Sequence, residues 1–261
     1  MRAPSSCLVL ALALALGGGV RAEPAPGRQV PAPVVDARSP TARTPCRADG
    51  QPPFVYAIGG STLQIVLGPM FEKRLGKLGM RVAFQGKSAS GLARYDYFDW
   101  PTVMQGVLAK QDPDVIYVTL GSNDGQSLRD AAGTWTHLHK PEWRAAYAAR
   151  IDAFLEQLAG PGRRRAIIWS GPAAHSVDLK RQRGAVVSEV IRERVRRFPG
   201  RAWYIDLFSR TATADGGALN ELVVGDELVP LRTADGFHLT RPGVEALMYE
   251  PVRALLAPCA R

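Results

Sequence analysis

The chain has 261 residues, of which 46% are hydrophobic and 22% charged, and its formal net charge at pH 7 is +9. This composition is ordinary for a globular protein and provides for one sizeable domain. The positive charge lies in separate groups without interleaved aromatic residues, which argues against nucleic acid as a partner. It favours contact with acidic envelope material such as cell-wall glycans, although a merely solvated charged surface explains it nearly as well. The groups are residues 163–165, 180–183 and 192–197.

Residues 1–22 have the anatomy of a secretory signal peptide. Arg2 gives a positive start, an apolar run covers 8–20, and Ala22 supplies a small residue at the cleavage position. The apolar run is too short for a comfortable membrane span. We therefore expect a periplasmic or secreted protein with no stable membrane span after cleavage, an uncleaved N-terminal anchor being the alternative.

Residues 23–53 are rich in Pro, Ala and Arg and show no apolar periodicity, which is typical of a flexible linker. Two cysteines remain after signal cleavage, Cys46 and Cys259, at opposite ends of the folded region. In an oxidising compartment they can form a disulfide that ties the linker to the last helix. Two unpaired thiols are the alternative.

From residue 54 to 261, strand patterns alternate with helix patterns. Helical spacing of apolar residues covers 143–158, 187–198 and 244–256. Alternation of this kind predicts right-handed crossovers and a parallel sheet, hence a single three-layer α/β/α sandwich. The five predicted strands are 54–58, 81–84, 115–120, 166–169 and 202–207.

A carboxylate and a histidine stand close together near the C-terminus, in a Gly-containing turn before the last helix. Asp235 precedes His238 by three residues, and a carboxylate that orients an imidazole is half of a nucleophilic triad. Ser61 follows the first predicted strand at the start of a helix, where the dipole favours developing negative charge. A simple helix cap is the alternative role for Ser61.

Two further strand ends offer hydrogen-bond donors for an oxyanion hole. Asn123 follows the third strand between two glycines, where its amide can donate to an oxyanion. An Asx-turn is the alternative use of this Asn-Asp pair. Gly91, after the second strand, lets its backbone N–H approach a substrate closely. Ser61, Gly91 and Asn123 each follow a predicted strand, so we expect them to lie at one edge of the sheet. Ligands bind at this edge, at the carboxyl ends of parallel strands.

Four short motifs, taken in chain order, resemble the four blocks of the SGNH/GDSL hydrolase superfamily. They are Gly60-Ser61, Gly91, Gly121-x-Asn123-Asp124 and Asp235-x-x-His238. The resemblance covers about residues 54–256 and is to a poorly characterised exported branch. It implies a flavodoxin-like sandwich fold.

The resemblance also implies roles for individual residues. Ser61 is the expected nucleophile, His238 the general base and acid, and Asp235 its orienting carboxylate. The backbone N–H groups of Ser61 and Gly91 and the Asn123 side chain are expected to form the oxyanion hole. Gly60 stands where the family motif has Asp, which alters the local support of Ser61.

Two aromatic residues are candidate substrate contacts. Trp100 ends an aromatic-rich segment, 94–101, that resembles a box of the exported branch, and it either lines the pocket or packs in the core. His175 follows the fourth strand and lacks an acid three residues away, so we expect a rim contact. The histidines lack a second cluster of ligands, so no metal is expected, and the triad chemistry needs no cofactor.

The expected function is that of an exported serine esterase that works through a Ser-linked acyl-enzyme. The expected substrate is an acylated carbohydrate or another small ester, with deacetylation of an envelope or extracellular carbohydrate as the reaction. A polysaccharide O-acetyltransferase with the same triad is the alternative. A non-catalytic glycan-binding domain is a third possibility.

Overall fold

The computed structural model describes residues 35–36 and 45–260. The predicted signal peptide and most of the predicted linker lie outside these residues. No helix in the described part of the chain is long and apolar enough to cross a membrane.

The core of the fold is a parallel sheet of the five predicted strands, which confirms the predicted α/β/α class. The residues of β2, β4, β7 and β8 are almost all buried, because helices cover both faces of the sheet, whereas the edge strand β3 is only partly buried. A short strand, β1 (Val35–Asp36), adds to the β8 edge in antiparallel orientation. The order across the sheet is β1-β8-β7-β4-β2-β3. The parallel strands are β2 (Phe54–Gly59), β3 (Arg81–Gly86), β4 (Val115–Thr119), β7 (Ala166–Ser170) and β8 (Ala202–Ile205).

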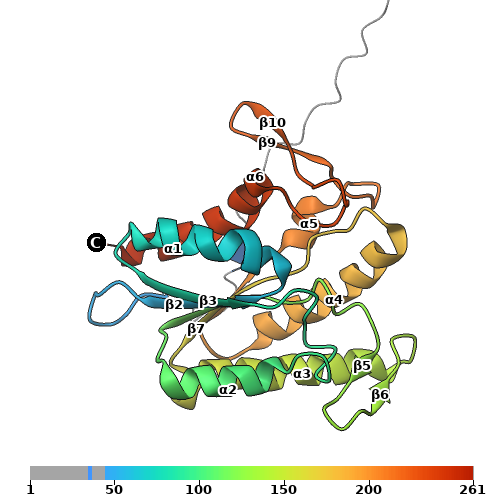
Figure 1. Ribbon diagram of the computed structural model, residues 1–261, viewed down its shortest axis with the longest axis horizontal. Helices are drawn as coiled ribbons and strands as arrows, with labels where there is room; N and C mark the ends of the chain where they lie inside the picture. Colours follow the sequence, from blue (N-terminus) through green and yellow to red (C-terminus); the bar gives the residue numbers. More distant parts are fainter. Residues whose placement is uncertain (1–34, 37–44, 261) are drawn as a thin grey trace, which may run out of the picture.

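Helices form a layer on each side of this sheet. One face carries α1 (Gly68–Gly76), α6 (Arg241–Val244) and α7 (Glu250–Leu256). The other carries α2 (Trp100–Lys110), α3 (Glu142–Ala159) and α4 (Asp178–Arg197). Figure 1 shows α1 and α6 above the strands and α2 and α3 below them.

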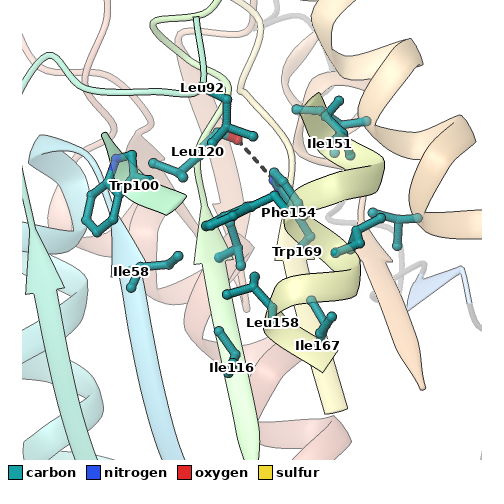
Figure 2. Packing of buried hydrophobic residues seen from close by; sticks show 14 of the residues in the cluster. Ile58, Leu92, Trp100, Ile116, Leu120, Ile151, Phe154, Leu158, Ile167 and Trp169 are labelled. Carbon is teal, nitrogen blue, oxygen red and sulfur yellow. Dashed lines mark hydrogen bonds between the residues drawn. The ribbon is translucent and has the colours of Figure 1, made fainter. Parts of the chain in front are cut away.

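Large aromatic side chains fill the space between the sheet and the α2–α4 layer. Phe154 of α3 meets the Trp169 ring edge-on, with 6.3 Å between centroids. The Trp169 indole N–H donates to the Leu120 carbonyl oxygen at 3.1 Å, a bond drawn in Figure 2. Buried tryptophan keeps a polar partner in this way, so the strand carrying Trp169 is fixed against the end of β4.

Two helices contain a π-helical turn. One, η1 (Leu63–Leu67), lies between Ser61 and α1, and the other, η3 (Glu245–Tyr249), joins α6 to α7. The last helix begins with Thr240 as its N-cap, whose hydroxyl accepts from the Gly243 N–H at 3.2 Å. Single π turns often occur at functional sites, and here both occur in helices that begin beside the predicted site.

Short elements that the sequence pattern does not indicate complete the fold. Two hairpins, β5/β6 and β9/β10, extend from the sandwich. The elements are β5 (Leu128–Arg129), β6 (Trp135–Thr136), η2 (Pro161–Arg163), α5 (Leu207–Thr211), β9 (Glu221–Val224), β10 (Glu227–Pro230) and η4 (Ala257–Cys259).

The predicted disulfide is present in the structure. Cys46 and Cys259 are bonded with a sulfur–sulfur distance of 2.07 Å and are separated by 213 positions. The Cys46 carbonyl accepts from Arg201, which immediately precedes β8. The bond therefore lies at the edge of the sheet where the parallel strands begin, close to the C-terminus marked in Figure 1.

Candidate active site

The central strands β2 and β4 create the crevice in which the predicted residues meet. From β2 the chain crosses to β3 on one side, and β4 then pairs on the other side of β2. Ligands bind at such switch points in open parallel sheets. Gly59 allows β2 to end tightly against β4, since a Cβ there would lie 2.4 Å from Cγ2 of Thr119. Ser61 therefore enters the crevice at the first residue of the next helix.

The structure brings Ser61, His238 and Asp235 together in a hydrogen-bonded chain. Ser61 Oγ lies 2.8 Å from His238 Nε2, and His238 Nδ1 lies 2.6 Å from Asp235 Oδ2. An ionised carboxylate only accepts hydrogen bonds, so Nδ1 carries the proton. Nε2 is then free to accept the Ser61 hydroxyl proton, as a general base must.

A tight turn holds the Asp235 carboxylate. Its Oδ1 accepts from the Thr233 hydroxyl at 2.7 Å and from the Phe237 and His238 N–H groups at 2.9 and 3.0 Å. Gly236 in this turn has φ +67°, a conformation that favours glycine. The hydrogen bonds from His238, Thr233 and the backbone hold the pKa of Asp235 well below its usual range. The carboxylate is therefore charged throughout the neutral pH range.

Asn123 lies on the other side of Ser61, after β4. One N–H of its amide donates to the Ser90 carbonyl at 3.0 Å, which fixes the amide plane. An amide carries two N–H donors, so a second is available for an oxyanion. A Cβ at Gly60, where the superfamily motif has Asp, would lie 3.6 Å from Asn123 Nδ2, an ordinary contact. This position therefore has room for a side chain next to the amide.

Gly91 is packed against the buried side chain of Asp124. A Cβ at Gly91 would lie 2.0 Å from Asp124 Oδ1, so only glycine fits without movement. Asp124 also accepts from the Ala93 N–H and the Tyr147 hydroxyl, each at 2.8 Å. Burial raises the pKa of the Asp124 carboxyl. Asp124 thus fixes the segment that follows β3, in which Ser90 rather than Gly91 lines the cavity.

A small cavity opens beside the Ser61 hydroxyl. Its volume is about 40 Å³. This exceeds the roughly 10–15 Å³ that one water needs, so the space admits a small group. Apolar side chains form part of its lining, and the donor side chain of Asn123 forms another part. The lining residues include Ser61, Ser90, Asn123, Ala173, Leu207, Phe237, Leu239 and Met248.

A larger cavity of about 260 Å³ lies next to the first, and Asn123 and Phe237 line both. His175 also lines it, at 7% exposure, and stacks on Phe237 with 5.2 Å between ring centroids. Burial and the nearby Lys180 lower the pKa of His175. The Val177 N–H donates to His175 Nδ1 at 2.9 Å, so the proton of the neutral ring is on Nε2.

Trp100 lines neither cavity, and its predicted role as a substrate contact is wrong. The side chain is fully buried in the α2–α4 side of the core. Its indole N–H donates to the Ser90 hydroxyl at 3.0 Å. Of the two roles that the sequence left open, the structure shows core packing, because α2 turns this aromatic ring toward the sheet.

Several residues around the cavities were not predicted to form part of the site. Phe237 lines both cavities, and Lys180 and Arg183 line the larger one. The three-residue spacing of Lys180 and Arg183, at the start of a helix after the fourth strand, was a usable signal in the sequence, since such residues share a helix face.

Among residues 45–260, no group of three or more His, Cys, Asp or Glu side chains is placed to bind a metal ion.

Two solved structures with a TM-score of 0.50 share this fold. The aryl esterase of M. smegmatis is 15% identical, with a TM-score of 0.50 and coverage of 77% of this chain and 98% of that one. Its inhibitor-bound form gives 14% identity, a TM-score of 0.50 and coverages of 77% and 99%. An acetylxylan esterase from Geobacillus stearothermophilus is also similar, with 14% identity, a TM-score of 0.48 and coverage of 79% of this chain and 95% of that one.

No curated protein matches the sequence. Residues 54–253 match the family described as "Protein of unknown function (DUF459)", a region that includes every residue of the candidate triad. The chain thus belongs to the DUF459 family and has the fold of the SGNH/GDSL esterases.

Proposed function

We propose that this protein is a serine esterase of SGNH type that removes acetyl groups from carbohydrates after export from the cytoplasm. The single observation that carries the proposal is the hydrogen-bonded chain Ser61–His238–Asp235 at the mouth of a cavity. A serine hydroxyl bonded to an imidazole, which is itself oriented by a carboxylate, is the arrangement that activates a serine for acyl transfer.

The reaction runs in two halves. Ser61 Oγ attacks the ester carbonyl carbon while His238 Nε2 takes the hydroxyl proton, and the negative charge moves onto the carbonyl oxygen. Asn123 donates to this oxyanion, together with backbone N–H groups of Ser61 and Gly91. The carbon–oxygen bond to the alcohol then breaks, and His238 returns its proton to the departing alcohol. In the second half, water attacks the carbonyl carbon of the acyl-enzyme through the same steps, which releases the acid and restores Ser61.

The two cavities suggest where the acyl group and the alcohol part of the ester bind. An acetyl group is a small group of the kind that the space of about 40 Å³ beside Ser61 admits. The larger cavity, about 260 Å³, has room for a sugar ring on the alcohol side. The space beside Ser61 is the narrower of the two, so we expect acetate esters to be preferred over butyrate and longer esters.

The larger cavity would accept a sugar hydroxyl as readily as it would release one, so O-acetyl transfer to a glycan is the second candidate function. The Cys46–Cys259 disulfide supports action outside the cytoplasm, because such bonds persist in oxidising compartments.

Hydrolysis of 4-nitrophenyl acetate by purified protein tests the proposal. Ser61→Ala should lower kcat/KM by at least roughly 10³-fold, because the nucleophile is removed. Ser122→Ala is the matched control, since Ser122 also lines both cavities but has no bond to His238. Full activity in Ser61→Ala would disprove the triad. Adding methyl glucoside separates the two functions, because acetylated glucoside detected by mass spectrometry indicates transfer and free acetate alone indicates hydrolysis.

A further inference from the structure

We infer that the larger cavity binds a negatively charged group on the alcohol side of the ester, so that the preferred substrate is an acetylated acidic saccharide. This inference rests on the proposed esterase function and specifies its substrate class. It starts from the charges that line the cavity. Lys180 and Arg183 both face it, and none of its lining residues is acidic.

The two basic side chains line the same cavity from one helix. They lie three residues apart in the first turns of α4, on the same face of the helix. Gly125 brings the loop after β4 close to them, since a Cβ there would lie 2.8 Å from Cβ of Arg183. Arg183 therefore packs against the loop that carries Asn123, and Lys180, Arg183 and Asn123 line the same cavity.

Nearby carboxylates do not neutralise this pair. Neither Lys180 nor Arg183 forms an ion pair with any carboxylate in the described part of the chain, whereas the neighbouring Arg181 does so with Asp178. Asp235 is held by His238 and the turn around it. Among residues 45–260, no carboxylate pairs with these cations, so an anionic group of a bound substrate can do so.

Neutral donors complete the cavity. Gln126 lines it, and its amide donates to the Asn123 carbonyl. His175 has a lowered pKa and holds its ring proton on Nε2, so it can donate to a substrate oxygen without adding charge. Cations at one end and neutral donors along the wall suit a sugar ring that carries a carboxylate or a phosphate.

Matched aryl acetates test this inference. The substrates are 4-acetoxybenzoate, 4-acetoxyphenyl phosphate and the neutral 4-acetoxybenzamide, all with the same acyl group. The readout is the ratio of kcat/KM for each anionic ester to that for the amide, at about 0.1 M ionic strength, where the Debye length is about 10 Å. The double variant Lys180→Gln/Arg183→Gln should lower the carboxylate ratio by roughly three- to tenfold, as expected for two ion pairs made by exposed side chains. The phosphate ratio shows which anion the pair prefers.

The control removes two charges elsewhere. Lys77→Gln/Lys110→Gln alters exposed residues at the far ends of α1 and α2. It should leave the ratio unchanged, because charges more than a Debye length away are screened. An unchanged ratio in the Lys180/Arg183 variant, or an equal fall in the control, would overturn the inference.

A binding experiment separates failure of this inference from failure of the esterase function. Calorimetric titration of wild-type protein with 4-hydroxybenzoate and 4-hydroxybenzamide needs no turnover. We expect the benzoate to bind more tightly and to lose that advantage in the Lys180→Gln/Arg183→Gln variant. Equal affinity for the two compounds would reject the anion site, whereas absence of ester hydrolysis would reject only the proposed function.

Discussion

Replacing Asp235 by Asn should nearly abolish activity while leaving the fold in place. Three donors converge on Oδ1 of Asp235, from Thr233, Phe237 and His238. The amide oxygen must stay at that position to accept them, so the amide nitrogen takes the place of Oδ2 and donates to His238 Nδ1. The imidazole proton then moves to Nε2 and points at Ser61, and the ring can no longer act as a base.

The expected loss in kcat is roughly 10⁴-fold, the typical effect of locking a catalytic histidine in the wrong tautomer. At 1.36 kcal/mol per tenfold, this corresponds to roughly 5.4 kcal/mol of lost transition-state stabilisation. The assay is hydrolysis of 4-nitrophenyl acetate, and NMR of ¹⁵N-labelled histidine reports the tautomer directly.

The chain contains its own control for this experiment. The sequence Thr-Ala-Asp-Gly occurs twice, at 213–216 and 233–236. In both copies the Thr hydroxyl donates to the Asp and the Gly N–H to the Thr carbonyl, but no histidine follows the first copy by three residues. Asp215→Asn should therefore retain activity. An Asp235→Asn variant within tenfold of wild type would refute the assigned role of the carboxylate.

Three other substitutions test separate parts of the structure. Asn123→Ala should lower kcat by roughly 10²- to 10³-fold in the same assay, since an oxyanion donor is lost; a change below threefold would contradict that role. Gly91→Ala should lower the free energy of unfolding in urea by about 1–3 kcal/mol, because its Cβ overlaps the buried Asp124 carboxyl. Replacing Cys46 and Cys259 with Ser should lower it by about 5 kcal/mol in the chain-entropy model for a closed loop of this length, with hydrolysis retained.

The parallel sheet was predictable because its strands are short apolar runs, most of them buried on both faces, and this pattern can be read without knowing the rest of the fold. The Asp235–His238 pair was also predictable, since both residues lie in one turn. The place of Trp100 was not, because an aromatic residue after a loop can face either the crevice or the sheet, and only the docking of α2 decides between them. The same holds for Lys180 and Arg183, whose contact with the cavity depends on how α4 meets the loop after β4.

The turn from Thr233 to His238 closes on itself, because the Thr233 N–H donates to the His238 carbonyl at 2.9 Å and Gly236 donates back to Thr233 at 2.9 Å. All the bonds that orient the carboxylate against the imidazole are therefore internal to six residues. The rest of the fold anchors the turn through Ser176, whose hydroxyl donates to the Gly236 carbonyl at 2.9 Å, and sets the distance from Nε2 to Ser61 Oγ. The carboxylate and the imidazole thus keep their mutual orientation within one turn. Motions of the domain would change reactivity chiefly through the distance between this turn and Ser61.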